Sequence, residues 1–232
     1  MSKFSENLLE LPCFSKSVSV QKKIEFITQI DLHDTDVLYA IYYFLENKIL
    51  KHKELPDCVD GTLYKVLINS SNLQISNLIK DNFIDGLLPL NSTFYLHHSR
   101  LQDLLLKDNF QEADKFTATF LCLLADLKDR NWLYFSDVSK IAGLDLQIID
   151  NMWKIYSQGK FGFSIQKQIW LNNNCNWDLL WDKLGWRKDN VLCRYPTDFV
   201  WNLNAPVGHL PLSNQLRGFQ TLKALLNLDI WG

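Results

Sequence analysis

The sequence predicts an all-α protein built from two helical domains. Apolar residues recur at helical spacing along most of the chain, as at Ile24, Ile27 and Ile30 near its start. Short polar stretches that contain helix-capping residues separate these periodic runs. No region alternates apolar and polar residues for long enough to indicate a strand-rich sheet. Together these observations place the chain in the all-α class.

Residues 1–92 are expected to form a small helical bundle or a helical-repeat domain. Asp31–Thr35 supplies turn and N-cap residues between two early helices. A third helix is expected at 62–68 and a fourth at 75–80, each after a polar turn. Short helices with short connections are typical of antiparallel bundles and repeat stacks. The stretch LLPLNST at 87–93 is the expected connector to the second domain.

The second domain, residues 93–232, is also expected to be helical. Helix is predicted at 101–105, 112–127, 145–158, 164–171, 177–186 and 212–228. Asp114 lies near the start of the second of these runs, where an acidic side chain complements the helix dipole. Asp145 is expected to cap the third run, and Gly159 to end it in a left-handed conformation. Residues 194–212 contain three prolines and are expected to form a long loop.

The composition argues against several functional classes. The 232 residues are 47% hydrophobic and 22% charged, which is an ordinary globular balance. A formal net charge of −2 argues against a nucleic-acid binder, and no apolar run approaches the ~20 residues that cross a bilayer. Five scattered cysteines without a C-x-x-C pair favour reduced thiols over a disulfide framework or a zinc site. The N-terminus resembles neither a secretory signal nor an arginine-rich transit peptide.

The sequence offers no constellation of catalytic residues. It lacks the phosphate-binding loop, the dinucleotide fingerprint and the G-x-S-x-G nucleophile elbow. The adjacent His97 and His98 would point ~100° apart on a helix and are interpreted as partly exposed helix-start residues. Asp178 and Asp182 lie one turn apart and indicate the wet face of an amphipathic helix. His209 either ties down loop carbonyls, which is the favoured interpretation, or ligates a haem iron.

Aromatic and basic residues are instead concentrated between positions 160 and 217. The rings are Phe161, Phe163, Trp170, Tyr195, Phe199 and Trp201, and the cations are Lys160, Lys167, Arg187, Lys188, Arg194 and Arg217. Apolar walls with a few cations suit a large, flat, apolar ligand that bears carboxylates. The alternative is that these rings form the hydrophobic core, which composition alone favours. From the residues, both interpretations stay open.

Several long motifs resemble one known family. The runs IIDNMWKIYSQGKFGFSIQKQIW, LGWR and FVWNLNAPVGHLPLSNQLRG resemble, in order and spacing, the genomes-uncoupled-four family of tetrapyrrole-binding proteins. LQDLLLKDNFQEADKFTATFL resembles the segment that opens the same core domain. VDGTLYKVLINS and DGLLPL resemble the N-terminal helical domain of cyanobacterial and plastid-encoded members. The resemblance covers roughly residues 18–228.

The resemblance implies a helical core shaped like a cupped hand, whose apolar palm binds protoporphyrin IX and its magnesium complex. It implies no enzymatic activity and no intrinsic cofactor. Members stimulate magnesium chelatase together with its large porphyrin-binding subunit at the entry to chlorophyll synthesis, and in plants they also bear on plastid-to-nucleus signalling. We therefore expect a monomer in the plastid stroma, made inside the plastid, or in a cyanobacterial cytoplasm, with peripheral membrane association left open.

Carried onto this chain, the resemblance assigns residues to the palm. They are Phe161, Phe163, Ile165, Ile169, Tyr195, Phe199, Pro206 and Leu210, with the loop around Tyr195 and Phe199 acting as a flap over the porphyrin. Arg217 is the first choice for a propionate partner, and Asn214 could offer an amide oxygen toward a bound magnesium or its water. The family often has tryptophan at the position of Tyr195, so affinity is expected to be weaker here. Trp153, Trp170 and Trp186 are expected in the core.

Two other functions remain open at this point. The chain could be a helical protein-interaction module without a porphyrin ligand of its own, in which the N-terminal helices dock a partner. It could also be a haem carrier, an alternative that depends on His209 as an axial ligand.

Overall fold

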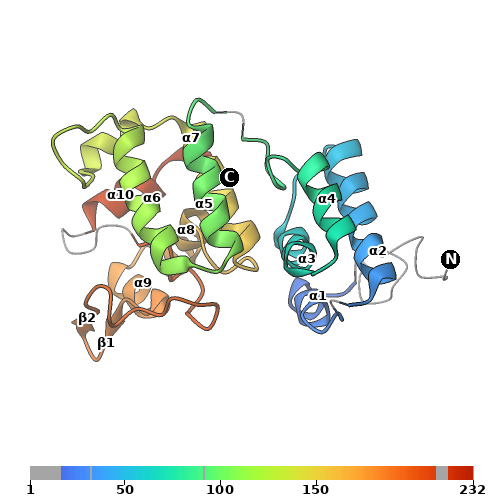
Figure 1. Ribbon diagram of the computed structural model, residues 1–232. Helices are drawn as coiled ribbons and strands as arrows, with labels where there is room; N and C mark the ends of the chain where they lie inside the picture. Colours follow the sequence, from blue (N-terminus) through green and yellow to red (C-terminus); the bar gives the residue numbers. More distant parts are fainter. Residues whose placement is uncertain (1–16, 32, 91, 213–218, 232) are drawn as a thin grey trace. The chain divides into compact units, whose positions relative to one another are not determined.

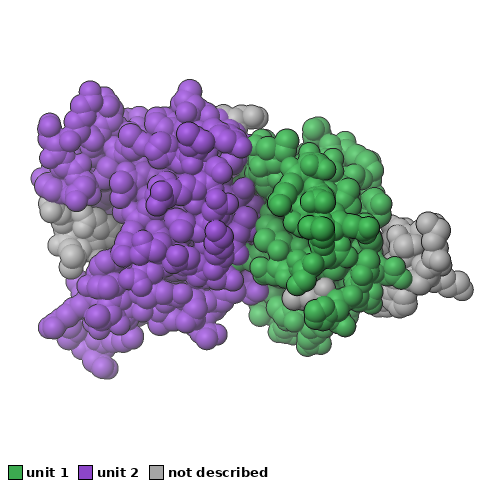
Figure 2. Space-filling model, in the orientation of Figure 1, with its two compact units in different colours: residues 1–89 green, residues 90–232 purple. Residues whose placement is uncertain are grey.

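The computed structural model describes residues 17–31, 33–90, 92–212 and 219–231, and their regular structure is almost entirely helical (Figure 1). The chain divides into two compact units, residues 1–89 and 90–232 (Figure 2). The boundary expected between residues 92 and 93 lies three residues further along the chain than this division. None of the helices among the described residues is long and apolar enough to cross a membrane.

Unit 1 is a small bundle of short helices. Its elements are α1 (Val20–Ile27), α2 (Thr35–Leu45), the π-helix η3 (Glu46–Lys51), α3 (Cys58–Asn69) and α4 (Leu73–Asn82). Asp34, Asp57 and Asn72 cap α2, α3 and α4 by accepting backbone N–H bonds. Because Asp57 forms a reciprocal capping box with Asp60, α3 begins at Cys58, four residues before the predicted start.

Over its described residues, unit 2 consists of helices, two short 3₁₀ turns and one small hairpin. The helices are α5 (Tyr95–Leu106), α6 (Phe110–Leu124), α7 (Gly143–Tyr156), α8 (Phe163–Asn172), α9 (Trp177–Leu184) and α10 (Gln220–Leu226). The 3₁₀ turns are η4 (Phe135–Lys140) and η6 (Asp229–Trp231), and the hairpin pairs β1 (Arg187–Lys188) with β2 (Val191–Leu192). The sequence did not predict the hairpin, which turns through Asp189 and Asn190 at positive φ.

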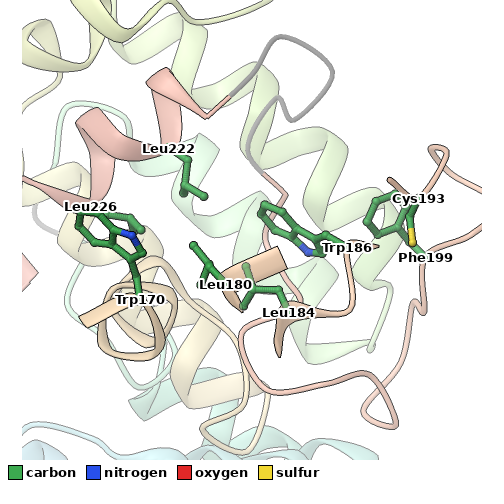
Figure 3. Packing of buried hydrophobic residues seen from close by; sticks show 8 residues of the cluster. All are labelled: Trp170, Leu180, Leu184, Trp186, Cys193, Phe199, Leu222 and Leu226. Carbon is green, nitrogen blue, oxygen red and sulfur yellow. The ribbon is translucent and has the colours of Figure 1, made fainter. Parts of the chain in front are cut away.

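The interior of unit 2 contains the tryptophans that were expected there. Trp153 of α7 is fully buried, and its indole N–H donates to the hydroxyl of Thr117 on α6 at 3.1 Å. A second cluster joins α8, α9 and α10 to the chain that follows α9 (Figure 3). Its members are Trp170, Leu180, Leu184, Trp186, Cys193, Phe199, Leu222 and Leu226. The prediction that Trp153, Trp170 and Trp186 form core is confirmed.

Two local predictions in unit 2 are wrong. Asp145 does not cap α7, because the helix begins at Gly143 and Asp145 lies buried in its first turn. There its carboxylate accepts the hydroxyl of Ser92 at 2.5 Å and contacts His98 Nε2 at 2.9 Å. His98 is therefore fully buried rather than partly exposed, because Asp145 supplies the partner that lets an imidazole be buried in α5.

The last predicted helix is shorter than expected. The apolar pattern indicated helix over 212–228, whereas α10 spans only Gln220–Leu226 and Leu212 still belongs to the preceding loop. Residues 213–218 lie outside the described part of the chain. Helix α9 also ends early, at Leu184, because Gly185 takes the left-handed conformation with φ +67°.

Candidate functional site

The two glycines of the turn between α7 and α8 hold backbone conformations that other residues rarely adopt. Gly159 follows α7 with φ +76°, and Gly162 precedes α8 with φ +141°. A Cβ atom on Gly162 would lie 2.8 Å from Asp150 Oδ1. That carboxylate of α7 accepts the N–H of Ser164 at 2.9 Å and so caps the start of α8. The turn is fixed by its glycines and by a carboxylate from the preceding helix.

The two phenylalanines of this turn point into the protein. Phe161 and Phe163 are both fully buried. Phe161 packs edge-to-face on Phe110 at 5.4 Å between ring centroids and near Trp153 at 6.3 Å, whereas Phe163 lies 5.9 Å from Trp231. Neither ring exposes surface in this structure. Their environment is that of core residues, and their contact with a ligand stays a prediction.

Residues 194–212, which we call the aromatic loop, carry a compact group of rings. Tyr195, Phe199 and Trp201 lie with their ring centroids 5.7 to 6.4 Å apart. The indole N–H of Trp201 donates to the carbonyl of Pro196 at 3.0 Å, which closes the loop on itself. Within this group Phe199 is buried, whereas Tyr195 remains 38% exposed. The structure thus brings the two predicted flap residues together and leaves the tyrosine ring accessible.

His209 ties the aromatic loop to the end of α9. The backbone N–H of Val200 donates to His209 Nε2 at 3.1 Å, so that Nε2 is the acceptor nitrogen. Nδ1 therefore carries the proton and donates to the carbonyl of Leu184 at 2.6 Å. Burial lowers the pKa of His209, which keeps the ring neutral. With both nitrogens engaged, the structure supports the loop-tethering interpretation and not an iron ligand.

The end of the aromatic loop is seated against α8 and the turn before it. The N–H of Gly208 donates to the carbonyl of Lys160 at 2.7 Å, and the N–H of Gly162 donates to that of Leu210 at 3.0 Å. The buried Gln166 amide donates to the carbonyls of Gly208 and Pro211 at 2.9 and 2.8 Å. These bonds fix the backbone of residues 208–211 against the turn that the glycines shape.

Asp114 attaches the same loop to α6, and its interpretation as a helix-terminus charge is wrong. Its side chain is buried, and its Oδ1 accepts the N–H of Leu212 at 2.6 Å. Burial raises the pKa of this carboxyl to about 7, although the Leu212 hydrogen bond and the nearby Lys115 oppose the rise. A surface carboxylate at a helix start would remain solvated, whereas this one lies under the loop.

Most of the cations that could anchor carboxylates already have partners within the protein. Lys160 donates to the carbonyl of Leu203, Lys167 to that of Leu228, Lys188 to that of Asp198, and Arg187 binds Asp178 and Asp182. Asp178 and Asp182 are both exposed, which agrees with the expectation that they lie on the solvent-exposed face of an amphipathic helix. Arg217 and Asn214 lie outside the described residues, so their roles toward propionate and magnesium stay predictions.

The remaining predicted wall residues differ in exposure. Ile165 and Ile169 of α8 are half-buried, Pro206 is exposed, and Leu210 is fully buried. Ile169 packs on the cluster shown in Figure 3. Tyr195, Pro206 and, in part, the two isoleucines are therefore the predicted wall residues that offer surface to a ligand.

Sequence reasoning missed a second exposed aromatic segment in unit 2. Tyr134 and Phe135 are 49% and 59% exposed, and residues 126–130, shortly before them in the chain, line a hollow of about 300 Å³. Arg130 holds this segment: it donates to the carbonyl of Trp132 at 2.7 Å, pairs with the buried Asp137 and lies 4.5 Å over the Tyr134 ring. The signal available in the sequence was the aromatic stretch NWLYF at 131–135, which directly follows the charged residues 128–130.

Within the described residues, no three His, Cys, Asp or Glu side chains converge in a way that could hold a metal ion. The cysteines described there, Cys58, Cys122, Cys175 and Cys193, are all free thiols.

Comparison with known proteins identifies the family. Residues 91–229, which lie in unit 2, match the GUN4-like family. A ycf53 protein of Porphyra purpurea is 43% identical over 92% of this chain and 90% of its own length. The Arabidopsis thaliana "Tetrapyrrole-binding protein, chloroplastic" is 38% identical over 55% of this chain and 52% of its own length. The solved structure of GUN4 from Chlamydomonas reinhardtii superimposes with a TM-score of 0.58 at 35% identity, over 62% of this chain and 93% of that one. The resemblance and the all-α prediction are confirmed. This chain belongs to the GUN4-like family.

Proposed function

We propose that this protein binds protoporphyrin IX and its magnesium complex through unit 2, and that it stimulates magnesium chelatase without catalysing a reaction of its own. The observation that carries the proposal is the family match over residues 91–229. A relative that is 38% identical over 55% of this chain carries the name tetrapyrrole-binding protein. The aromatic loop of the same unit supplies a surface of the right chemistry.

A porphyrin is a planar, apolar ring system, and the aromatic loop offers a planar ring beside it. Burial of apolar area contributes ~25 cal/mol per Å², and stacked rings add to this. Tyr195 presents such an exposed ring, and it packs against the rings of Phe199 and Trp201. Because His209 binds the Val200 N–H and Gln166 binds the Gly208 carbonyl, the loop backbone is held in place, and little conformational entropy is lost when a ligand stacks on it.

The two porphyrin propionates need cationic partners, and we assign this role to Arg217. Lys160, Lys167 and Arg187 already bind groups of the protein itself, so their recruitment would break existing contacts. An arginine can pair with both oxygens of a carboxylate. We assign to Asn214 the amide oxygen that would approach the magnesium of the metallated ligand or its water, since magnesium prefers hard oxygen ligands.

The partner we propose is the large, porphyrin-binding subunit of magnesium chelatase. The protein would pass protoporphyrin to this subunit or take up its magnesium product, as a monomer. We place it in the plastid stroma or in a cyanobacterial cytoplasm, and the support for this is a relative whose name includes the word chloroplastic.

Porphyrin titration of the full chain tests the proposal. Micromolar protoporphyrin IX should quench tryptophan emission saturably and move the Soret band. Arg217→Gln should raise the Kd by about tenfold or more, the expected loss for a charge-assisted hydrogen bond. Arg100→Gln is the matched control, because Arg100 is an exposed arginine of α5 that lies over the Phe116 ring. No saturable change with the native protein would refute porphyrin binding.

Magnesium insertion by the chelatase, measured with and without the protein, tests the second half of the proposal separately. The rate at limiting protoporphyrin should rise when the native protein is added, and it should rise less with the Arg217→Gln variant. Porphyrin binding without any effect on this rate would leave a binding protein and refute the proposed stimulation.

A further inference from the structure

Asp114 is a buried carboxylate of α6. The residue is 4% exposed, and among the residues that the structure describes no cation forms an ion pair with it. Lys115, the next residue of α6, acts on it electrostatically, but its ammonium is exposed and bound to Glu112 at 2.7 Å. Such burial is costly unless the carboxylate makes a specific contact.

That contact is the backbone of the aromatic loop. Leu212 lies 98 positions further along the chain, and its N–H donates to Asp114 Oδ1 at 2.6 Å. Tyr195, at the other end of the loop, also lies within electrostatic range. Burial and then the Asp114 carboxylate raise the pKa of this phenol. Asp114 therefore faces the loop at both of its ends, at Leu212 through a hydrogen bond and at Tyr195 through its charge.

Most of the other bonds that seat the end of the loop come from groups that do not titrate. Gln166 donates its side-chain amide to the carbonyls of Gly208 and Pro211, and the Gly162 backbone donates to Leu210. Asp114 lies on α6 and accepts a hydrogen bond from the loop, whereas Gln166 and Gly162 donate hydrogen bonds to it. Two of the groups that hold residues 208–212 therefore change with protonation: Asp114, through its bond to Leu212, and the His209 ring, through its bonds to Leu184 and Val200.

We propose that Asp114 is a positioning residue for the aromatic loop, whose neutral carboxyl seats Leu212 on α6 and whose ionisation loosens the loop, so that porphyrin affinity falls as the pH rises. The inference rests on the proposed function for the identity of the ligand. The loop covers Asp114, and loosening the loop would return the carboxylate to water. Ionisation therefore favours the loosened state, even though an ionised acceptor makes the stronger single hydrogen bond. Burial places the pKa of this group at about 7, so that the change falls in an accessible pH range. The titratable and charged groups that act on it are Lys115 from its own helix and Tyr195 from the loop.

Three variants separate the charge of Asp114 from its size. Asp114→Asn keeps an acceptor oxygen but cannot ionise, and Asp114→Ala removes the acceptor altogether. Glu112→Gln is the matched control, because it removes a carboxylate from the exposed surface of the same helix, two residues away. Thermal melts of each variant establish that it is folded before binding is measured.

Protoporphyrin IX is titrated into each full-length protein between pH 6 and pH 8.5. From pH 6 to pH 8.5 the Kd of the native protein should rise about fivefold relative to that of Asp114→Asn, because ionisation of the buried carboxyl favours release of the loop. Asp114→Ala should bind more weakly than the native protein at pH 6, and Glu112→Gln should follow the native curve. The ratio to Asp114→Asn cancels the titration of the porphyrin itself. A native pH slope retained in Asp114→Asn, or a slope of the opposite sign, would overturn the proposal.

Amide exchange of Leu212, followed by NMR without porphyrin, distinguishes this inference from the proposed function. In the native protein at pH 6 the Leu212 amide should exchange at least about fivefold more slowly than in Asp114→Ala. If the native protein binds no porphyrin, the proposed function fails, and the exchange measurement alone decides whether Asp114 holds the loop. Equal Leu212 exchange in the two proteins would overturn the inference even if porphyrin binds.

Discussion

Replacing Asp114 by asparagine should stabilise the protein, and increasingly so as the pH rises. The carboxyl is buried, and its pKa is raised from 3.8 to about 7. An acid whose pKa is higher in the folded state than in the unfolded state binds its proton more tightly when folded. Its contribution to stability is therefore full below pH ~4 and is lost as the pH rises toward 7.

The magnitude follows from the size of the shift. A difference of about 3 pKa units corresponds to ~4 kcal/mol of unfolding free energy, at ~1.4 kcal/mol for each unit. Between pH 5 and pH 8 the loss should be ~3 kcal/mol, because part of the change already occurs below pH 5. Asparagine is neutral at every pH, so its unfolding free energy escapes this loss, although its amide forgoes the charge-assisted bond from Leu212.

Urea denaturation of the native protein and of Asp114→Asn, at half-unit intervals from pH 4.5 to 8.5, measures the effect. The unfolding free energy of the variant minus that of the native protein should rise with pH and level off above pH ~7.5. Glu112→Gln, which removes an exposed carboxylate of the same helix, should show a difference that changes little with pH. A native-minus-variant difference that stays constant from pH 5 to pH 8 would refute the assignment of a buried, destabilising charge to Asp114.

Three further predictions concern the aromatic loop. His209→Ala should lower the unfolding free energy by about 3 kcal/mol, since it strands the N–H of Val200 and the carbonyl of Leu184, and haem added to this variant should give the same spectrum as with the native protein. Gly208→Ala should cost about 2 kcal/mol by urea denaturation, because φ is +78° and the new Cβ would lie 2.6 Å from Leu184 Cδ2; an unchanged midpoint would contradict this. Tyr195→Trp should lower the protoporphyrin Kd on the order of threefold in fluorescence titrations, since a larger ring buries more area, and a higher Kd would show that this ring does not stack on the ligand.

The helices and the core could be predicted because their signals are local. Apolar spacing placed Ile24 and Ile27 in unit 1 on the buried face of α1, as the structure shows. Large aromatic residues on periodic helices, such as Trp153 and Trp170, were expected in the interior and lie there. Predicted helix boundaries were less accurate where a capping residue sets the helix start. The Asp57 cap, for example, makes α3 begin earlier than the apolar pattern indicated.

The polar contacts that position the loop could not be predicted, because they join residues far apart in the sequence. Asp114 and Leu212 meet across 98 positions, and His98 and Asp145 across 47. In each pair one partner looked like an ordinary helix-end residue, since its local surroundings are those of a cap or a solvated turn. Only the packing of α6 against the loop, or of α5 against α7, shows that these groups are buried.

The turn around Gly162 explains why a motif without catalytic groups can mark this family. Phe161 and Phe163 anchor the turn in the core, and the Gly162 N–H binds the carbonyl of Leu210 in the aromatic loop. The loop position would change if a side chain replaced the hydrogen of Gly162, because its Cβ would meet Asp150 Oδ1, which caps α8. The motif therefore positions the aromatic loop and need not contact the ligand itself. Resemblance in such a motif predicts the fold directly, whereas it predicts contacts of individual residues with a ligand only through the loop that the framework holds.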